Sequence, residues 1–287
     1  MSTQDRISVT IEGGVADVRL IRTDKMNALD DAMFDALVST GERLKTEAGV
    51  RAVVLSGDGR AFCAGLDMGN FGKMASGERK GGDGLVNTSR TPGGANRAQQ
   101  AAMVWREIPV PVIAAIHGVA FGGGFQVALG ADIRYVTADT KMSIMEIKWG
   151  LVPDMAGLVL MRHLARDDVI RELTYSGRQF SGEEAVGYGF ATRVCADPRA
   201  DALALAHEIA GKNPHAIRGD KRLFDLAASG ADQHAVLLAE SQEQGALIGS
   251  PNQIEAVLST MEKRAAKFAE AGRKGQTPSG VCPCQAT

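Results

Sequence analysis

Hydrophobic and polar positions follow two different periods along the first part of the chain. Residues Ser8–Ile11 and Val15–Ile21 alternate in character around two glycines, which predicts a β-hairpin. From about Asp30 to Thr46, apolar positions recur at helical spacing behind an acidic start, which predicts an amphipathic helix. The apolar stretch Arg51–Ser56 predicts a short buried strand. Strands and a helix in this order indicate an α/β fold.

Glycines interrupt the middle of the chain. The segment Ala61–Met68 breaks at Gly65 and is expected to open another helix. Residues 72–97 hold many glycines and few apolar side chains, which predicts a flexible loop or lid. A helix from about Ala98 to Arg106 is expected before an apolar run that enters Gly122–Gly124. An apolar helix is expected directly after these glycines.

The rest of the chain is expected to be mainly helical, after two strand-like segments at residues 133–138 and 141–145. Helical patterns occupy about 157–164, 168–175, 181–186, 199–211, 214–228, 232–249 and 252–270. No fixed-period repeat of the solenoid type is present. We therefore expect three parts, which are an α/β core over residues 1–212, a helical region over 213–270 and a disordered tail over 271–287.

Composition and charge exclude several classes of protein. The 287 residues are 45% hydrophobic and 23% charged, which is typical of a globular chain. Because 32 basic residues nearly balance 34 acidic ones, no net field favours nucleic acid or an anionic membrane. The sequence shows no signal peptide and no run long enough to span a membrane. The four cysteines fit no zinc spacing, so we expect no metal site and a reducing, cytoplasmic location.

The glycine triplet and two later carboxylates carry the candidate chemistry. Glycines between a strand and a helix leave N–H groups at the helix start open to a ligand, and these groups stabilise negative charge. Glu146 and Asp154 follow in or beside apolar sequence, where a free surface carboxylate is unusual. An anion cradle followed by two acid–base candidates indicates enolate chemistry.

Each of these features also has a plainer interpretation. The glycines would mark a close helix–strand crossing without a ligand, Glu146 a surface carboxylate at a strand end, and Asp154 a helix N-cap after Pro153. The triplet does not resemble a phosphate-binding loop, because no Lys-Ser/Thr follows the glycines. The spacing of the glycines also differs from the G-x-G-x-x-G dinucleotide motif.

Four segments, in this order, together resemble one known family. They are KMNALD (Lys25–Asp30), GRAFCAGLDM (Gly59–Met68), AAIHGVAFGGGFQVALGADIRYV (Ala114–Val136) and MEIKWGLVPDMAG (Met145–Gly157). Over roughly residues 7–268 the chain resembles the enoyl-CoA hydratase/isomerase, or crotonase, family. The resemblance implies a spiral of repeated ββα turns that carries an acyl-CoA site. It also implies a C-terminal helical region used in trimer assembly, and homohexamers formed as dimers of trimers.

The resemblance also implies the catalytic residues. Backbone N–H groups of Leu66 and Gly123 would form an oxyanion hole that polarises the thioester carbonyl of an acyl-CoA. Hydratases of the family activate water with two glutamates, but the first of these positions is Gln126 here, and glutamine cannot accept a proton. Glu146 with Asp154 is the pair of the dienoyl-CoA isomerases, whose third acidic position is that of Gln126. Glu146, Asp154 and Gln126 are therefore the expected catalytic residues.

Substrate contacts are implied by position in the family's motifs. The residues expected at the acyl-CoA are Lys25, Met26, Ala28, Ala64, Asp67, Met68, Gly124 and Lys263. Lys263 matches a lysine that in relatives reaches the CoA phosphates of a neighbouring subunit. The stretch Met68–Met74 and Trp149 are expected either to shape an acyl pocket or to pack in an ordinary core. Coenzyme A would enter as part of the substrate, with no prosthetic group.

Three functions stay open, in order of preference. The first is double-bond isomerisation of an enoyl- or dienoyl-CoA through a stabilised thioester enolate. The second is hydration of a 2-enoyl-CoA, with Glu146 and either Gln126 or Asp154 orienting the water. The third belongs to another class, a non-catalytic acyl-CoA-binding or assembly subunit. In each case we expect a homo-oligomer without a nucleic-acid or membrane partner.

Overall fold

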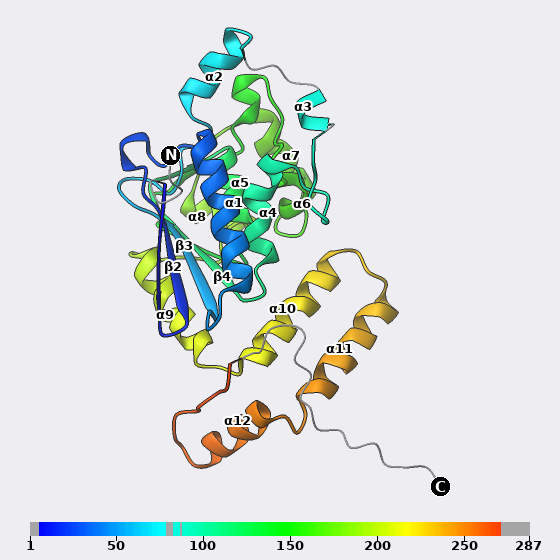
Figure 1. Cartoon of the computed structure of the whole chain (residues 1–287). Helices are drawn as coiled ribbons and strands as arrows, with labels where there is room; N and C mark the ends of the chain where they lie inside the picture. Colours follow the sequence, from blue (N-terminus) through cyan, green and yellow to red (C-terminus); the bar gives the residue numbers. More distant parts are fainter. Residues whose placement is uncertain (1–5, 79–82, 87, 271–287) are drawn as a thin grey trace.

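A six-stranded sheet forms the centre of the protein in a computed structural model that describes residues 6–78, 83–86 and 88–270 (Figure 1). Its strands, in spatial order, are β1 (Ile7–Glu12), β2 (Val15–Leu20), β3 (Ala52–Gly57), β4 (Val112–Ile116), β6 (Ile133–Val136) and β9 (Arg193–Val194). β1 and β2 form an antiparallel hairpin, and the other neighbours pair in parallel. Every residue of β3 and β4 is buried, because helices cover both faces of these strands.

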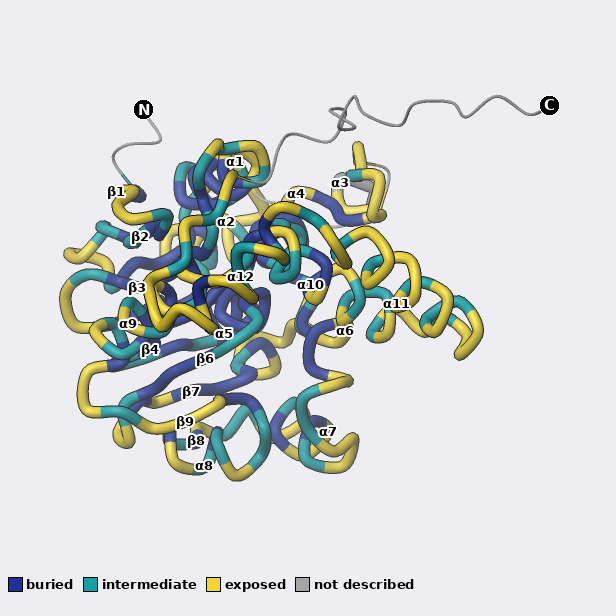
Figure 2. Tube along the Cα trace, turned by 90° about the horizontal axis from the view of Figure 1, so that it is seen from below, coloured by how far each residue is buried: buried dark blue, intermediate teal, exposed yellow. Residues whose placement is uncertain are grey.

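Helices on the two faces of the sheet divide the interior into two cores. Helices α1 (Asp31–Thr46) and α4 (Arg97–Glu107) pack together over one face, and α9 (Pro198–Ala210) covers the other. Successive side chains of β3 alternate between these faces, so that Val53 belongs to the larger core and Val54 to the core under α9. Figure 2 shows the buried residues concentrated along the strands and the helix sides that meet them.

A second, three-stranded sheet alternates with the first along the chain. Its order is β5 (Val119–Phe121), β7 (Lys141–Ser143) and β8 (Phe180–Ser181). β4 leads to β5 and then to α5 (Gly123–Leu129), and β6 leads to β7 and then to the 3-10 helix η3 (Glu146–Trp149). Each turn thus places one strand in the large sheet and the next in the small sheet before a helix follows. This is the repeated ββα winding that the resemblance implied.

The remaining helices of the core are short. They are η2 (Thr23–Lys25), α2 (Met68–Ala75), α3 (Asp83–Val86), α6 (Gly157–Met161), α7 (Asp167–Ser176) and α8 (Gly182–Tyr188). Among the described residues, no helix is both long and apolar enough to cross a membrane.

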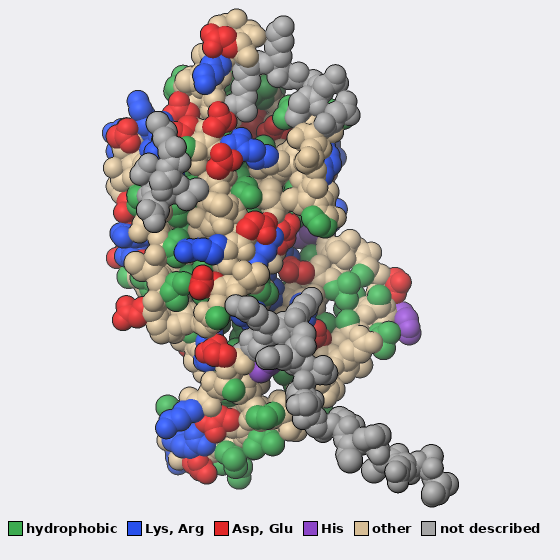
Figure 3. Space-filling view, viewed as in Figure 1, with side chains coloured by type: hydrophobic (Ala, Val, Ile, Leu, Met, Phe, Trp, Pro, Cys, Tyr) green, Lys and Arg blue, Asp and Glu red, His purple; other side chains and the backbone are tan. Residues whose placement is uncertain are grey.

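Three C-terminal helices extend from the core, α10 (Pro214–Ala228), α11 (Gln233–Leu247) and α12 (Pro251–Met261) (Figure 1). α10 is anchored by the buried Lys221, whose ammonium donates to the Val110 carbonyl at 3.0 Å and to the Asp132 carboxylate at 2.8 Å. No residue of α11 is buried. The large exposed apolar side chains of the three helices are Phe224, Leu237, Leu238, Ile254, Val257, Leu258 and Met261. Figure 3 shows hydrophobic side chains gathered over this part of the surface.

Most predicted elements are present within a few residues of their expected ends, but two predictions were wrong. The stretch 72–97 is no continuous loop, since α2 runs into it and α3 lies within it. The helix α2 forms despite its glycines because Phe71 and Met74, at helical spacing, face a cavity described below. The helix expected over 252–270 ends at Met261. The chain then folds back, and the Asn252 side chain pairs with the backbone of Ala269. The predicted tail, 271–287, and residues 79–82 and 87 of the predicted loop lie outside the described residues.

Candidate active site

The turn at Gly65 is held against the end of β5. Gly65 has φ +87°, and a Cβ atom there would lie 2.5 Å from the Phe121 carbonyl oxygen, so only glycine fits. On its other side, the Gly65 carbonyl accepts from the Leu29 N–H at 2.8 Å, and the Ala64 N–H donates to the Met26 carbonyl at 2.9 Å. These contacts bring the backbone of Leu66 beside the start of α5.

Gly123 is the first residue of α5, and its environment leaves no space for a side chain. A Cβ atom there would lie 2.7 Å from the Met155 sulfur and 2.8 Å from a Leu29 methyl group. The first N–H groups of a helix have no partner within it. Within the described part of the chain, neither the Gly123 nor the Leu66 N–H donates to a backbone carbonyl, and both residues line one cavity. The predicted pair of oxyanion donors is therefore brought to a common space.

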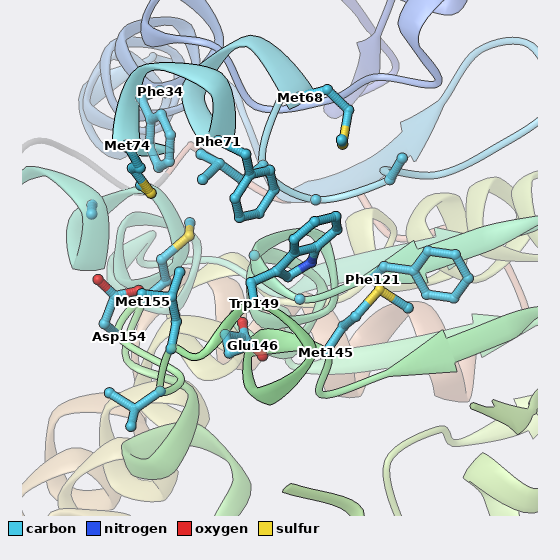
Figure 4. Close-up of a pocket in the computed structure, with 18 of the residues that line it drawn as sticks. Phe34, Met68, Phe71, Met74, Phe121, Met145, Glu146, Trp149, Asp154 and Met155 are labelled. Atoms are coloured by element: carbon cyan, nitrogen blue, oxygen red, sulfur yellow. The ribbon is translucent and has the colours of Figure 1, made fainter. Parts of the chain in front are cut away.

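That cavity has a volume of about 540 Å³ and an almost wholly apolar wall (Figure 4). Besides the two turns, the larger lining side chains are Phe34, Met68, Phe71, Met74, Leu85, Phe121, Met145, Trp149, Leu151, Val152 and Met155. Glu146 and Asp154 are the only ionisable side chains among the lining residues that the structure describes. A concave apolar site with two convergent acids is typical of a small-molecule or substrate site.

Glu146 opens η3 and is only 9% exposed. Burial raises the pKa of its carboxyl group, and the negative charge of Asp154 adds to the rise, while hydrogen bonds from its own backbone and from Gln126 oppose it. Its Oε2 atom is buried and has no hydrogen-bond partner among the described residues. Glu146 is therefore no surface carboxylate, and its pKa is raised in the direction that favours proton transfer near neutral pH.

Asp154 lies in the segment between η3 and α6, and it lines the same cavity. Figure 4 places it beside Met155, on the side of the cavity away from Phe121 and Met145. The residue that precedes α6 as its cap is Ala156, so Asp154 is not the N-cap of this helix. The two carboxylates thus face one cavity from two different segments.

Gln126 contacts both of these segments from α5. Its carboxamide nitrogen donates to Glu146 Oε1 at 2.6 Å. Its oxygen accepts from the backbone N–H of Met155 at 3.0 Å and of Gly157 at 2.9 Å. Gln126 does not itself line the cavity, although the sequence predicts it as a catalytic residue.

An aromatic pair closes the cavity between α2 and η3. The rings of Phe71 and Trp149 stack with centroids 4.2 Å apart and planes 23° from parallel. The ammonium group of Lys148 lies 5.3 Å from the centre of the Trp149 ring. Met68, Phe71 and Trp149 therefore shape the cavity, as one of the two interpretations of this stretch predicted.

The other predicted contact residues have varied positions. Ala64 lines the cavity, and the Met26 carbonyl supports the turn that carries it. Ala28 is bonded instead to Lys25 and to the Arg22 side chain. Gly124 is the close crossing that the plainer interpretation described, because a Cβ atom there would lie 2.5 Å from the Cys63 carbonyl. Lys25 ends η2 and is exposed. Its part in ligand binding stays a prediction.

Asp67 and Lys263 are placed by structural contacts. Burial alone would raise the pKa of the Asp67 carboxyl. Hydrogen bonds from the Gly69 N–H and from the Arg22 guanidinium, 2.7 Å away, outweigh this effect and hold the pKa below its usual range. Asp67 thereby caps α2. Lys263 follows α12, which lies at the opposite end of the molecule from α2 (Figure 1). The contact of Lys263 with the CoA phosphates of a neighbouring subunit stays a prediction.

Sequence reasoning missed several lining residues. Phe34 on α1 and Met155 were not singled out, although Phe34 falls on the apolar face of a predicted helix. Nothing in the sequence distinguishes a residue on this face that meets a cavity from one that meets the core. Arg22, which pairs with both Asp30 and Asp67, was also missed. In the described ranges, no group of three or more His, Cys, Asp or Glu side chains is placed to hold a metal ion.

Comparisons with known proteins identify the family of this chain. The family model described as Enoyl-CoA hydratase/isomerase matches residues 10–271. The chain is 34% identical to the mouse mitochondrial Delta(3,5)-Delta(2,4)-dienoyl-CoA isomerase over 72% of its own length, and it spans 64% of the length of that relative. It is 30% identical to a Bacillus subtilis protein named Probable enoyl-CoA hydratase, over 91% of this chain and 98% of that protein.

Solved structures show the same architecture. A crystal structure of enoyl-CoA hydratase from Bacillus anthracis superposes with a TM-score of 0.81 at 26% identity, covering 92% of this chain and 98% of that one. An enoyl-CoA hydratase from Polaromonas sp. JS666 has the same TM-score of 0.81 at 23% identity, covering 92% and 100%, and it shows the fold alone.

Proposed function

The chain belongs to the enoyl-CoA hydratase/isomerase family, and on that premise we propose that it is an acyl-CoA enzyme that moves double bonds along an enoyl- or dienoyl-CoA. The observation that carries the proposal is the meeting of two unpartnered backbone N–H groups and two carboxylates in one apolar cavity. The dienoyl-CoA isomerase name of several relatives supports this choice over the other reactions of the family.

The two N–H groups would bind the thioester oxygen. The groups of Leu66 and Gly123 belong to rigid turns, so that they are already in place when negative charge develops on that oxygen. Preorganised donors of this kind contribute about 3–4 kcal/mol each to the transition state. Coenzyme A enters as part of the substrate in this proposal, and no prosthetic group takes part.

One acid would remove a proton from one carbon, and the other would deliver a proton to a second carbon. A Cβ atom at Gly122 would lie 3.3 Å from Glu146 Oε1, so Glu146 is beside the oxyanion turn and suited to the carbon next to the thioester. Glu146 takes a proton from that carbon, and the electron pair delocalises through the double bonds onto the thioester oxygen. Asp154 lies farther along the cavity (Figure 4), begins the step protonated and gives its proton to the far carbon of the conjugated system. Proton exchange with solvent then returns Glu146 to the ionised form and Asp154 to the protonated form. The net change is a shifted double bond, with no oxidant and no water consumed.

The acyl group that fits this cavity is apolar. Apart from the two acids, the wall consists of methionine, aromatic and aliphatic side chains and backbone, and the Trp149 indole N–H is the one strong neutral hydrogen-bonding side-chain group among the described lining residues. A hydroxyl or amide on the acyl chain that does not reach this N–H would lose its water without gaining a partner. We therefore expect unsubstituted, unsaturated acyl chains to be preferred.

Hydration is the second candidate, because relatives named as enoyl-CoA hydratases cover almost the whole chain. It needs two groups that hold and activate a water molecule. The polar atoms of Gln126 are already bonded to Glu146 and to two backbone N–H groups, which argues against a second water ligand there. A non-catalytic acyl-CoA-binding subunit is the third candidate, and a cavity with a buried, partnerless Glu146 Oε2 argues against it.

An assay with three substrates tests the proposal. Purified protein is incubated with crotonyl-CoA, a 3-enoyl-CoA and a 3,5-dienoyl-CoA, and products are identified by mass and absorbance. We expect a product of unchanged mass from the 3-enoyl or 3,5-dienoyl substrate and little hydration of crotonyl-CoA. A product heavier by one water from crotonyl-CoA would support the hydratase instead. Binding without turnover of any of the three would support the non-catalytic subunit.

We also propose that the chain assembles into trimers or hexamers in the cytoplasm. The apolar side chains on α10–α12 leave more hydrophobic surface in water than a monomer usually exposes. We expect sedimentation at micromolar concentration to give a trimer or a hexamer. Replacing Leu237 and Leu238 by lysine should shift this protein toward smaller species. A wild-type monomer would contradict the proposal.

A further inference from the structure

Gln126 is a buried carboxamide whose orientation is fixed by its neighbours. The side chain is 1% exposed, and its oxygen accepts from two backbone N–H groups, those of Met155 and Gly157. Only an acceptor can meet two N–H donors, so the carboxamide cannot be turned over. Its nitrogen must therefore face Glu146, where it donates to Oε1 at 2.6 Å.

This arrangement needs glutamine rather than glutamate. A carboxylate at position 126 could accept the same two N–H groups, but its second oxygen would then face the Oε1 atom of Glu146. Two carboxylate oxygens at hydrogen-bond distance must share a proton, because both cannot stay ionised. With glutamine, Glu146 gains a donor and no second negative charge at this point. Asp154 is the other titratable group that acts on it.

The same bonds hold the Glu146 carboxylate by one of its two oxygens. Oε1 is engaged by Gln126, whereas Oε2 is buried without a partner, and the residue lines the cavity. The bond to Met155 fixes the backbone directly after Asp154. One side chain thus connects the segments that carry the two acids.

We propose that Gln126 is a positioning residue, which holds Glu146 by its Oε1 atom and sets the two carboxylates relative to each other. This inference rests on the proposed isomerase function and deepens it. It reassigns Gln126 from an expected catalytic residue, and from a ligand of attacking water, to a residue that acts through Glu146.

The first test removes the hydrogen bonds of Gln126 and keeps its size. Gln126→Met should lower kcat for the preferred substrate by up to about 10²-fold, with a much smaller change in KM, because misplaced catalytic groups slow the chemical step rather than binding. Gln100→Met is the matched control. Gln100 is 2% exposed and donates to Glu42 and Glu107, but it lies outside the cavity lining. Equal losses of kcat in both variants, or no loss in Gln126→Met, would overturn the proposal.

The second test adds the carboxylate. Gln126→Glu should move the acidic limb of the kcat/KM pH profile upward by about one pH unit or more, because a like charge raises the pKa of Glu146. Hydration of crotonyl-CoA should not develop, since the proton is held between the two acids. An unchanged acidic limb, or efficient hydration by this variant, would show that position 126 does not act through Glu146.

A substrate-free measurement separates this inference from the proposed function. The protonated carboxyl stretch of Glu146 is identified by infrared difference between the wild type and Glu146→Gln and is then titrated. We expect the titration midpoint to rise in Gln126→Glu and to stay unchanged in Gln100→Met. An unshifted midpoint in Gln126→Glu would reject the positioning role. Inactivity of the wild type toward all three acyl-CoA substrates would reject only the isomerase function.

Discussion

Replacing Glu146 by glutamine is expected to lower kcat by about 10²- to 10⁴-fold, the usual effect of losing a general base. Glutamine keeps the size of the side chain and can still accept from Gln126 at the position of Oε1. Its carboxamide cannot take a proton from the substrate. The acyl-CoA should therefore bind with little change in Kd while turnover nearly stops. Steady-state kinetics and calorimetric titration with a substrate analogue measure the two effects separately.

Glu183→Gln is the control for this change, because Glu183 is an exposed glutamate on α8, outside the cavity lining. It should leave kcat unchanged. The wild type should lose activity as the pH falls through the raised pKa of Glu146, since the base is then protonated. Near-wild-type turnover by Glu146→Gln would reject Glu146 as the base.

The stability of the fold gives an independent readout of the same group. Burial raises the pKa of Glu146 in the folded state above its unfolded value. In the window between these two pKa values the folded protein binds more protons, so the free energy of unfolding falls as pH rises through the window. The Glu146→Gln variant lacks the titrating carboxyl group, so its free energy of unfolding does not fall in this way as pH rises. Its melting temperature relative to the wild type should thus be higher above the window than below it.

Replacing Asp154 by asparagine is expected to lower isomerisation of a 3,5-dienoyl-CoA by about 10²- to 10⁴-fold. The loss follows because asparagine cannot deliver the proton to the far carbon. If Glu146 completes the proton transfer alone on the shorter unsaturated system of a 3-enoyl-CoA, the variant should lose less activity with that substrate than with the dienoyl-CoA. The ratio of the two kcat values is the measured quantity.

Asp139→Asn is the control, since Asp139 is exposed and lies outside the cavity lining. A second measurement is exchange of solvent deuterium into the substrate. Asp154→Asn should still exchange the proton next to the thioester, because Glu146 and the oxyanion turns are intact. Efficient hydration of crotonyl-CoA by the wild type, retained in the Asp154→Asn variant, would show that the isomerase assignment is wrong.

Local sequence patterns predicted the elements whose stability is local. The β1–β2 hairpin and α1 were predicted because their apolar periods and turn or capping residues agree with one another. The end of α12 was not predicted, because it depends on Asn252 pairing with the backbone of Ala269, a contact that periodicity does not encode. The extent of α2 into the predicted loop was missed for a related reason, since its apolar side faces a cavity formed by distant segments.

The candidate site divides in the same way. Family motifs located Glu146, Asp154 and the two glycine turns, and these were the residues that the fold brought to one cavity. The motifs did not reveal that Gln126 bonds to both acidic segments, since its partners lie 20 to 31 positions away along the chain. Their identity depends on the crossing of α5 with η3 and α6, which only three-dimensional structure supplies.

Phe71 and Trp149, whose rings close the cavity, differ in how far each can be substituted without a loss of activity. Trp149 shares the four-residue helix η3 with Glu146, so a substitution that enlarges the acyl site there also disturbs the base. Phe71 stands on α2, which carries neither acid. New acyl specificities should therefore arise at lower cost to turnover through changes on the α2 side. For anyone redesigning this enzyme, α2 is the segment to diversify and η3 the segment to keep.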